Sequence, residues 1–195
     1  VDIIGSLPGA DKGLEGSHLD IVFELAKRYN KRIHVHVDQL NTPAEKETEL
    51  LARKTMQHGY EGMVTAVHSI SIAAHDKSYR EEVYKMSRDA GLSFITCPTA
   101  WIDSRRTEVY SPTHNSITPV DEMIAQGLIV AIGSDNIHDV YKPYSTGDMR
   151  TELKFLLEAT HIYDQDALVK IATENGLKVI GSYEGGDRVV GDNKS

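Results

Sequence analysis

Short apolar runs alternate with longer amphipathic stretches along the whole 195-residue chain. The apolar runs have the length and composition of buried β-strands, and the amphipathic stretches repeat their apolar residues at helical spacing. Strands are predicted over residues 1–6, 32–38, 62–68, 92–97 and 128–134. Helices are predicted over residues 17–30, 43–58, 78–90, 119–127, 147–159 and 165–175. The pattern therefore predicts strands and helices in strict alternation over most of the chain.

Two features of the sequence mark helix ends. Thr42 is followed by Pro43 and, three residues on, by Glu45, which predicts a capping box with proline in the first turn of the helix. Gly91 and Gly127 follow the ends of two other predicted helices, as expected for glycine just past a helix C-terminus.

Alternating strands and helices predict a parallel sheet in a single domain that spans residues 1–195. The strands are nearly continuous apolar runs, which is typical of strands buried on both faces. An open, doubly wound sheet and a (β/α)8 barrel both satisfy this pattern. No glycine-rich loop follows the first strand, so a nucleotide-binding version of the doubly wound sheet has little support.

Charge and composition exclude several classes of partner. The net charge of −8 argues against nucleic acid, which requires a basic face. No apolar run approaches the ~20 residues of a membrane span. Cys97 is the only cysteine, so no intrachain disulfide can form and a cytoplasmic, reducing location is expected. Because the sequence starts with Val1 directly on a strand-like run, we expect it to begin within a fold.

Three predicted strands end in side chains that bind metals. His36, His68 and Asp135 stand at or just after the carboxyl ends of their strands, where the active site of a β/α barrel lies. Imidazole and carboxylate suit a divalent transition metal. His34 shares a strand face with His36 but lies deeper, so we interpret it as a hydrogen-bonded core residue.

The order and spacing of His36, His68 and Asp135, and the segment from Ser134 to Met149, resemble the amidohydrolase superfamily. The similarity favours the branch of the cytosine deaminases and the N-isopropylammelide hydrolases, and it covers nearly the whole chain. It implies a (β/α)8 TIM-type barrel of which this chain covers about strands 4–8, a partial barrel. It also implies that His36, His68 and Asp135 are ligands of one divalent metal ion, Zn or Fe.

Two departures from the family pattern affect the expected chemistry. The His-x-His of the family's first strand, which supplies two further ligands, is absent from this sequence. Gln39 stands three residues after His36, where deaminases of this branch have a glutamate that moves a proton. An amide cannot titrate, so another group takes that role, the substrate differs, or the activity is lost.

The resemblance assigns catalytic roles to Asp135, His68 and Gln39. Asp135 would be the general base, His68 would bind the water or the oxyanion or complete the metal shell, and Gln39 would orient the substrate. Asn136 and Tyr141 are further candidates for substrate binding. Weaker candidates near the site are Arg105, Arg106 and His138. The other histidines, which are predicted to lack partners, are His18, His58, His75, His114 and His161.

The function expected from the sequence is metal-dependent hydrolytic deamination or dealkylamination of a cyclic amidine or amide, such as a pyrimidine or triazine. Hydrolysis of a ring amide is an alternative that Gln39 leaves open. A different alternative is a catalytically incomplete remnant that self-associates, because five strands cannot close an eight-stranded barrel and leave unpaired edges. We expect a small-molecule substrate and a homo-oligomer, with no nucleic acid or membrane partner.

Overall fold

The computed structural model describes residues 1–102 and 117–182. These residues contain one parallel sheet of five strands in the order β1-β2-β3-β4-β5. The strands are β1 (Ile3–Ser6), β2 (Arg32–Val37), β3 (Val64–His68), β4 (Ser93–Thr96) and β5 (Ile129–Ile132). All five predicted strands are confirmed, each slightly shorter than its apolar run. A consecutive strand order is that of a (β/α)8 barrel, whereas a doubly wound sheet reverses its order in the middle.

Helices connect the strands and extend beyond the last one. The α-helices are α1 (Glu15–Tyr29), α2 (Glu47–His58), α3 (Lys77–Asp89), α4 (Val120–Ala125), α5 (Met149–Thr160), α6 (Gln165–Ala172) and α7 (Glu174–Ile180). Three short 3-10 helices follow strand ends, namely η1 (Pro8–Ala10), η2 (Ile70–Ala74) and η3 (Pro98–Ile102). None of the described helices is long and apolar enough to cross a membrane.

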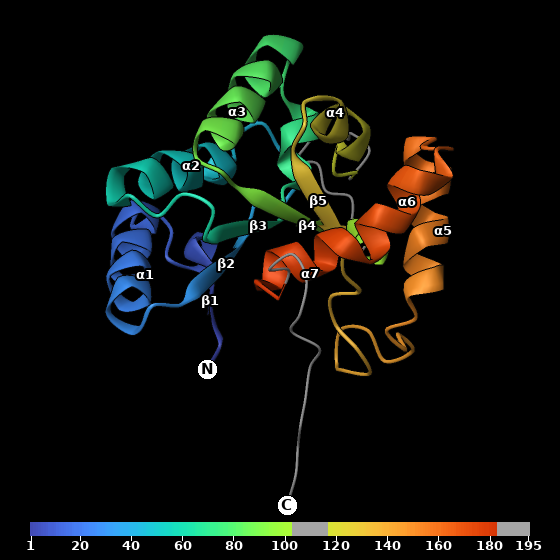
Figure 1. Cartoon of the computed structure of the whole chain (residues 1–195), viewed down its shortest axis with the longest axis horizontal. Helices are drawn as coiled ribbons and strands as arrows, with labels where there is room; N and C mark the ends of the chain where they lie inside the picture. Colours follow the sequence, from blue (N-terminus) through green and yellow to red (C-terminus); the bar gives the residue numbers. More distant parts are fainter. Residues whose placement is uncertain (103–116, 183–195) are drawn as a thin grey trace, which may run out of the picture.

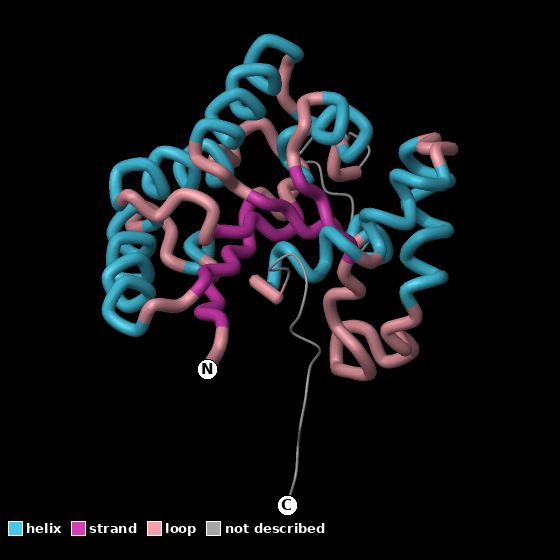
Figure 2. Tube along the Cα trace, viewed as in Figure 1, coloured by secondary structure: helices cyan, strands magenta, loops and turns pink. Residues whose placement is uncertain are grey.

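Helices α1 to α4 form an arc around one side of the sheet, and α7 lies on the other side (Figures 1 and 2). Strand β2 shows how its residues divide between these two faces. Ile33, Val35 and Val37 are fully buried in the core that α1 and α2 share with the sheet. On the opposite face, the side chains of Arg32 and His34 each donate a hydrogen bond of 3.1 Å to the carbonyl of Val179 in α7.

Strand β2 therefore alternates between buried and half-buried residues, which differs from the predicted burial on both faces. Its inner face is polar and only partly covered by α7. Strand β3, in the middle of the sheet, is buried at every position, as predicted. His34 is hydrogen-bonded at the base of the inner face, which agrees with its interpretation as a structural residue.

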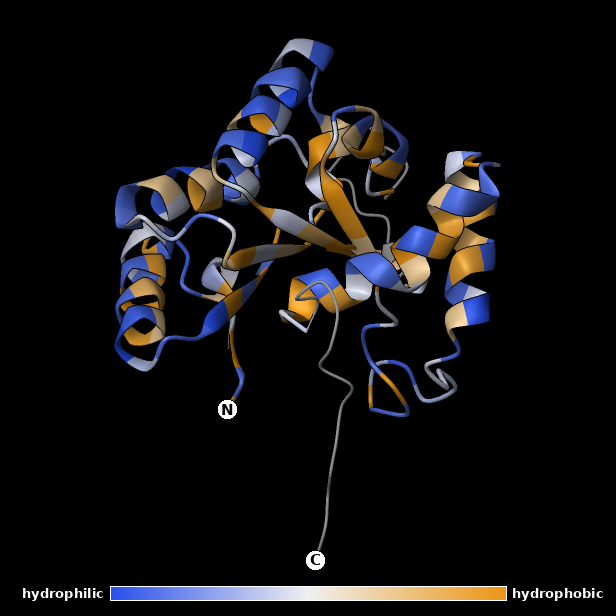
Figure 3. Ribbon diagram, in the orientation of Figure 1, coloured by the Kyte–Doolittle hydropathy of each residue, from blue (hydrophilic) through white to orange (hydrophobic). Residues whose placement is uncertain are grey.

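The main core lies between the sheet and the outer helices, where the largest fully buried side chains include Phe23, Tyr84 and Phe94. Figure 3 shows hydrophobic residues along the strands and hydrophilic residues over the outward parts of the helices. This distribution is the one expected when each helix buries a single apolar stripe against a sheet.

The predicted start of the second helix is wrong. Helix α2 begins at Glu47, and the capping box of Thr42 and Glu45 does not form. The Glu45 carboxylate instead accepts hydrogen bonds from the Leu40 N–H and the Ser71 hydroxyl. The buried carboxylate of Asp38 takes the capping role, accepting hydrogen bonds from the N–H groups of Glu47 and Thr48 at the start of α2. The strand end and the following helix are therefore tied together directly.

The helix predicted over residues 165–175 is two helices. Helix α6 ends at Ala172, and the backbone of Thr173 leaves the helical region before α7 begins at Glu174. The break redirects the chain so that α7 crosses the inner face of the sheet. There the side-chain amide of Asn175 donates to the carbonyl of Val130 in β5.

The carboxylate of Glu47 gives the fold a pH dependence. Burial, together with the neighbouring Asp38 and Glu45, raises the pKa of Glu47 from 4.5 to about 7. Between these values the folded chain holds a proton that the unfolded chain has released, so stability falls as pH rises from about 4.5 to about 7. We expect Glu47→Gln to flatten this part of the profile, measured as the urea midpoint at closely spaced pH values.

A suitable control is Glu82→Gln on the exposed surface of α3, which should leave the profile as it is in the unaltered protein. An unchanged slope in Glu47→Gln would show that Glu47 is not the group responsible.

Candidate active site

A pocket of about 510 Å³ opens at the carboxyl edge of the sheet. It contains all six side chains that the sequence selects, together with Leu7. Its lining residues are Leu7, His36, Gln39, His68, Asp135, Asn136 and Tyr141. Because β2, β3 and β5 are parallel, their carboxyl ends meet at this edge, and residues more than a hundred positions apart come together.

Two of the residues that line this pocket are histidines in contact with each other. Nδ1 of His36 and Nε2 of His68 lie 3.0 Å apart, within hydrogen-bonding distance. Burial lowers the pKa of His36, and burial together with the charge of His36 lowers the pKa of His68 to about 4. Both rings are therefore neutral at neutral pH, the form in which imidazole binds a metal. Nε2 of His36 is the ring nitrogen that this bond leaves available.

The backbone is left-handed at the ends of three strands. Asp38, His68 and Asp135 have φ values of 54°, 75° and 59°. For residues other than glycine this conformation costs on the order of 1 kcal/mol or more, and it concentrates at functional sites. At His68 and Asp135 it turns the chain sharply at the strand end, where both side chains line the pocket.

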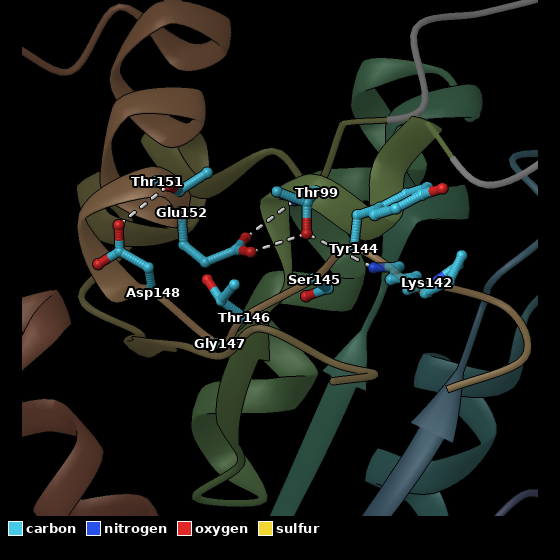
Figure 4. Close-up of a pocket in the computed structure, with 10 residues that line it drawn as sticks. Thr99, Lys142, Tyr144, Ser145, Thr146, Gly147, Asp148, Thr151 and Glu152 are labelled. Carbon is cyan, nitrogen blue, oxygen red and sulfur yellow. Dashed lines mark hydrogen bonds between the residues drawn. The ribbon is translucent and has the colours of Figure 1, made fainter. Parts of the chain in front are cut away.

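Asp135 is connected to a network that the sequence analysis missed. Its carboxylate lies 3.7 Å from Nζ of Lys142, which also lies 3.5 Å from the hydroxyl of Thr99. The Thr99 hydroxyl and N–H both donate to the buried carboxylate of Glu152, at 2.7 and 2.9 Å. Figure 4 shows Thr99 between Glu152 and Lys142, beside a second pocket of about 370 Å³.

The predicted substrate-binding residues form the open side of the first pocket. The side chain of Tyr141 is 83% exposed, so an aromatic face is available at the rim. The side-chain amide of Asn136 donates to the carboxylate of Asp139, which also accepts from the N–H groups of Tyr141 and Lys142. Asp139 thereby organises the loop that carries Asn136 and Tyr141. Gln39 reaches the pocket from the end of β2.

Among the weaker candidates, only His138 lies within the described residues. His138 does not line the pocket, and its ring bonds to the carbonyl of Pro143 within the same loop. Arg105, Arg106 and His114 lie outside the described residues.

The expectation that four other histidines lack partners is wrong. Each has a polar partner, and for His18, His58 and His75 the fold brings that partner from 12 or more residues away. The pairs are His18 with Ser6 and Asp11, His58 with Asp20, His75 with the carbonyl of Glu45, and His161 with Tyr163.

The donor chemistry of this pocket fits a divalent transition metal, since neutral imidazole and carboxylate are suitable ligands. Within residues 1–102 and 117–182, however, no three potential ligands are grouped closely enough to hold an ion by themselves. The bond between His36 and His68 also occupies one nitrogen of each ring. The described residues therefore bring His36, His68 and Asp135 to one pocket without forming a complete metal site by themselves.

Known proteins resemble this chain in sequence. Residues 10–186 match the model of the Amidohydrolase family. The N-isopropylammelide isopropyl amidohydrolase of Pseudomonas sp. (strain ADP) is 30% identical over 191 residues, which cover 92% of this chain and 42% of that protein. An uncharacterized protein of Haemophilus influenzae is 50% identical over 131 residues, covering 65% of this chain and 47% of its own length.

Solved structures share the fold. A 5-methylcytosine deaminase from Klebsiella pneumoniae, liganded with 5-fluorocytosine, matches with a TM-score of 0.84 and 25% identity, over 92% of this chain and 45% of that one. An N-isopropylammelide isopropylaminohydrolase from Burkholderia multivorans matches with a TM-score of 0.76 and 20% identity, over 93% of this chain and 44% of that one, and shows the fold alone.

This chain thus spans less than half the length of these relatives. The five consecutive parallel strands are part of a (β/α)8 barrel, and the resemblance inferred from the sequence is confirmed. By its fold and by the match over most of its length, the chain belongs to the amidohydrolase family.

Proposed function

We propose that the protein containing this chain is a hydrolase that releases an amine from a cyclic amidine or amide, such as a pyrimidine or triazine. The observation that carries the proposal is the convergence of His36, His68 and Asp135 in one pocket at the carboxyl edge of the sheet. The relatives named for the hydrolysis of N-isopropylammelide and the deamination of 5-methylcytosine support this class of substrate.

Asp135 is the proposed general base. Its carboxylate lines the pocket, 3.7 Å from Nζ of Lys142, and would accept a proton from the attacking water. His68, which is neutral because it is buried, can donate a hydrogen bond to an oxyanion that develops on the substrate. Asn136 and Tyr141 would contact the ring, Asn136 through its amide and Tyr141 through its exposed aromatic face.

We propose that His36 and Asp135 hold one divalent ion, Zn or Fe. Such an ion, when bound, lowers the pKa of water toward ~7 and polarises a carbonyl or amidine carbon. His68 either shares the ion, in which case its hydrogen bond to His36 is replaced, or keeps that bond and orients the His36 ring.

Gln39 bears on the choice of reaction. Its amide cannot carry a proton from the attacking water to a leaving amine, so in this proposal it orients the substrate through hydrogen bonds. The reactions to test are therefore simple deamination, release of an alkylamine and hydrolysis of a ring amide.

The test measures release of ammonia and isopropylamine from a panel of amino-substituted pyrimidines and triazines, with and without a chelator. We expect amine release from at least one member, its loss after chelation, and its recovery on addition of Zn²⁺ or Fe²⁺. A purified, folded protein that stays inert on the whole panel with both metals present would refute the proposed function.

A second candidate function rests on the sheet edges. Among the described strands, β1 pairs only with β2, and β5 pairs only with β4. Unpaired edges favour association, so the alternative is an inactive remnant that self-associates through β1 and β5. Light scattering of the purified protein separates the two candidates when it is combined with the activity panel. An inactive homo-oligomer favours the remnant, and an active protein of any size excludes it.

A further inference from the structure

A chain of three side chains outside the pocket has the connectivity of a catalytic triad. The hydroxyl of Ser6 lies 2.8 Å from Nε2 of His18, and Nδ1 of the same ring lies 2.6 Å from a carboxylate oxygen of Asp11. Ser6 ends β1, Asp11 follows η1, and His18 lies in the first turns of α1. The three residues thus come from three consecutive segments that meet at the carboxyl edge of the sheet.

The two hydrogen bonds assign the roles of the ring nitrogens. A carboxylate can only accept, so Asp11 places the proton of neutral His18 on Nδ1. Nε2 then carries the lone pair and accepts the proton of the Ser6 hydroxyl. This is the arrangement by which a serine hydrolase activates its nucleophile, and it recurs on unrelated folds in any order along the chain.

The location of Ser6 also suits a nucleophile. The chain passes directly from strand β1 through Ser6 and Leu7 into the 3-10 helix η1, so the serine stands on a strand-to-helix turn at the edge of the sheet. Leu7 lines the pocket that contains His36, and Gly9 and Lys12 line another pocket of about 580 Å³. The segment that joins Ser6 to Asp11 therefore contributes residues to the lining of two pockets.

Stabilisation of the fold is a weak explanation for this arrangement. The side chains of His18 and Asp11 are 23% and 55% exposed, and a pair with this exposure contributes about 0–1 kcal/mol to stability. The hydrogen bonds at both nitrogens of the His18 ring therefore add little to the stability of the fold. Their main effect is to fix the orientation of the ring beside the Ser6 hydroxyl.

We propose that Ser6 is an activated nucleophile that cleaves small carboxylic esters, a hydrolytic activity separate from the amine-releasing pocket. Oγ of Ser6 bonds to the ester carbonyl carbon while its proton moves to Nε2 of His18. The bond to the alcohol oxygen then breaks, and that proton leaves with the alcohol. Water next attacks the acyl-serine, giving up a proton through His18, and releases the carboxylic acid and the free Ser6 hydroxyl. Asp11 is a positioning residue that holds the His18 ring.

The test treats the purified protein with a fluorophosphonate probe in the presence of excess EDTA, so that a metal-dependent reaction cannot contribute. We expect a mass increase of one probe, located at Ser6 by peptide mapping, and slow turnover of p-nitrophenyl acetate. Ser6→Ala should abolish the labelling, and His18→Asn should slow it at least ~100-fold. Ser17→Ala, an exposed serine next to His18 on α1, is the matched control and should label at the normal rate.

The role of Asp11 is tested by a measurement that would not change if Asp11 only supported the fold. Asp11→Asn should slow labelling by ~10-fold or more with little change in the thermal midpoint, and Asp11→Glu should recover part of the rate. Absence of labelling in the unaltered protein, or equal labelling in a Ser6→Ala variant whose circular dichroism shows it to be folded, would overturn the proposal. Neither result depends on whether the other pocket releases amines.

Discussion

Replacing Asp135 by asparagine is expected to lower kcat for amine release by ~10²- to 10⁴-fold. Asparagine keeps the size of the side chain and its place in the pocket beside His36 and His68, but it cannot accept a proton at neutral pH. It also removes the charge that pairs with Lys142. Loss of a base acts on the chemical step, so the effect should fall on kcat with a much smaller change in KM.

The matched control is Asp121→Asn, at an exposed position in the first turn of α4, which should leave kcat within a factor of about two. Circular dichroism and a urea midpoint establish that Asp135→Asn is folded. If the folded variant retains more than about a tenth of kcat, Asp135 is not the base and the proposed mechanism is wrong.

The sequence predicted the position of the site because barrel geometry relates strand ends to one another. His36, His68 and Asp135 each stand at the end of an apolar run, and parallel strands must bring such ends to one edge. Gln39, Asn136 and Tyr141 follow the same strand ends and reach the same pocket for that reason. The catalytic and metal-binding roles of these residues stay predictions.

Residues held by contacts across the fold could not be found in this way. Lys142 lies in a polar loop and has no local feature that separates it from a solvated lysine, yet it reaches both Asp135 and Thr99. Glu152 sits on an amphipathic helix, and only the tertiary structure shows that it is buried against η3. The contact between Glu152 and Thr99 forms because α5 packs near the end of β4. The spacing of apolar residues along the sequence does not predict that packing.

Local signals were also overridden by tertiary contacts. Thr42 and Glu45 have the spacing of a capping box, but Ser71 and the Leu40 N–H attract Glu45, and Asp38 caps the helix from the preceding strand end. The Asp38 carboxylate is already fixed at the strand end, so it loses little conformational entropy when it caps the helix. Capping by Asp38 is therefore favoured over capping by the more mobile local partners Thr42 and Glu45. In the same way, His18 gained partners 7 and 12 residues away that local spacing does not reveal.

Glu152 connects the stability of the fold to the geometry of the site. Its side chain is 2% exposed and accepts both hydrogen bonds that Thr99 offers, which fixes helix α5 to η3 at the end of β4 (Figure 4). Glu152→Ala removes this buried carboxylate and leaves the partly buried N–H and hydroxyl of Thr99 without their acceptor. We expect a loss of roughly 3 kcal/mol in the free energy of unfolding, measured by urea denaturation.

Glu158→Ala, an exposed glutamate on the same helix, is the control and should change stability by less than about 0.5 kcal/mol. The Glu152 variant should also lose activity under conditions in which it is fully folded, because Thr99 then no longer holds Lys142 beside Asp135. A stability loss with unchanged kcat would show that the network supports only the fold. If Glu152→Ala loses both stability and kcat while Glu158→Ala loses neither, the buried contact between α5 and η3 also positions the proposed base.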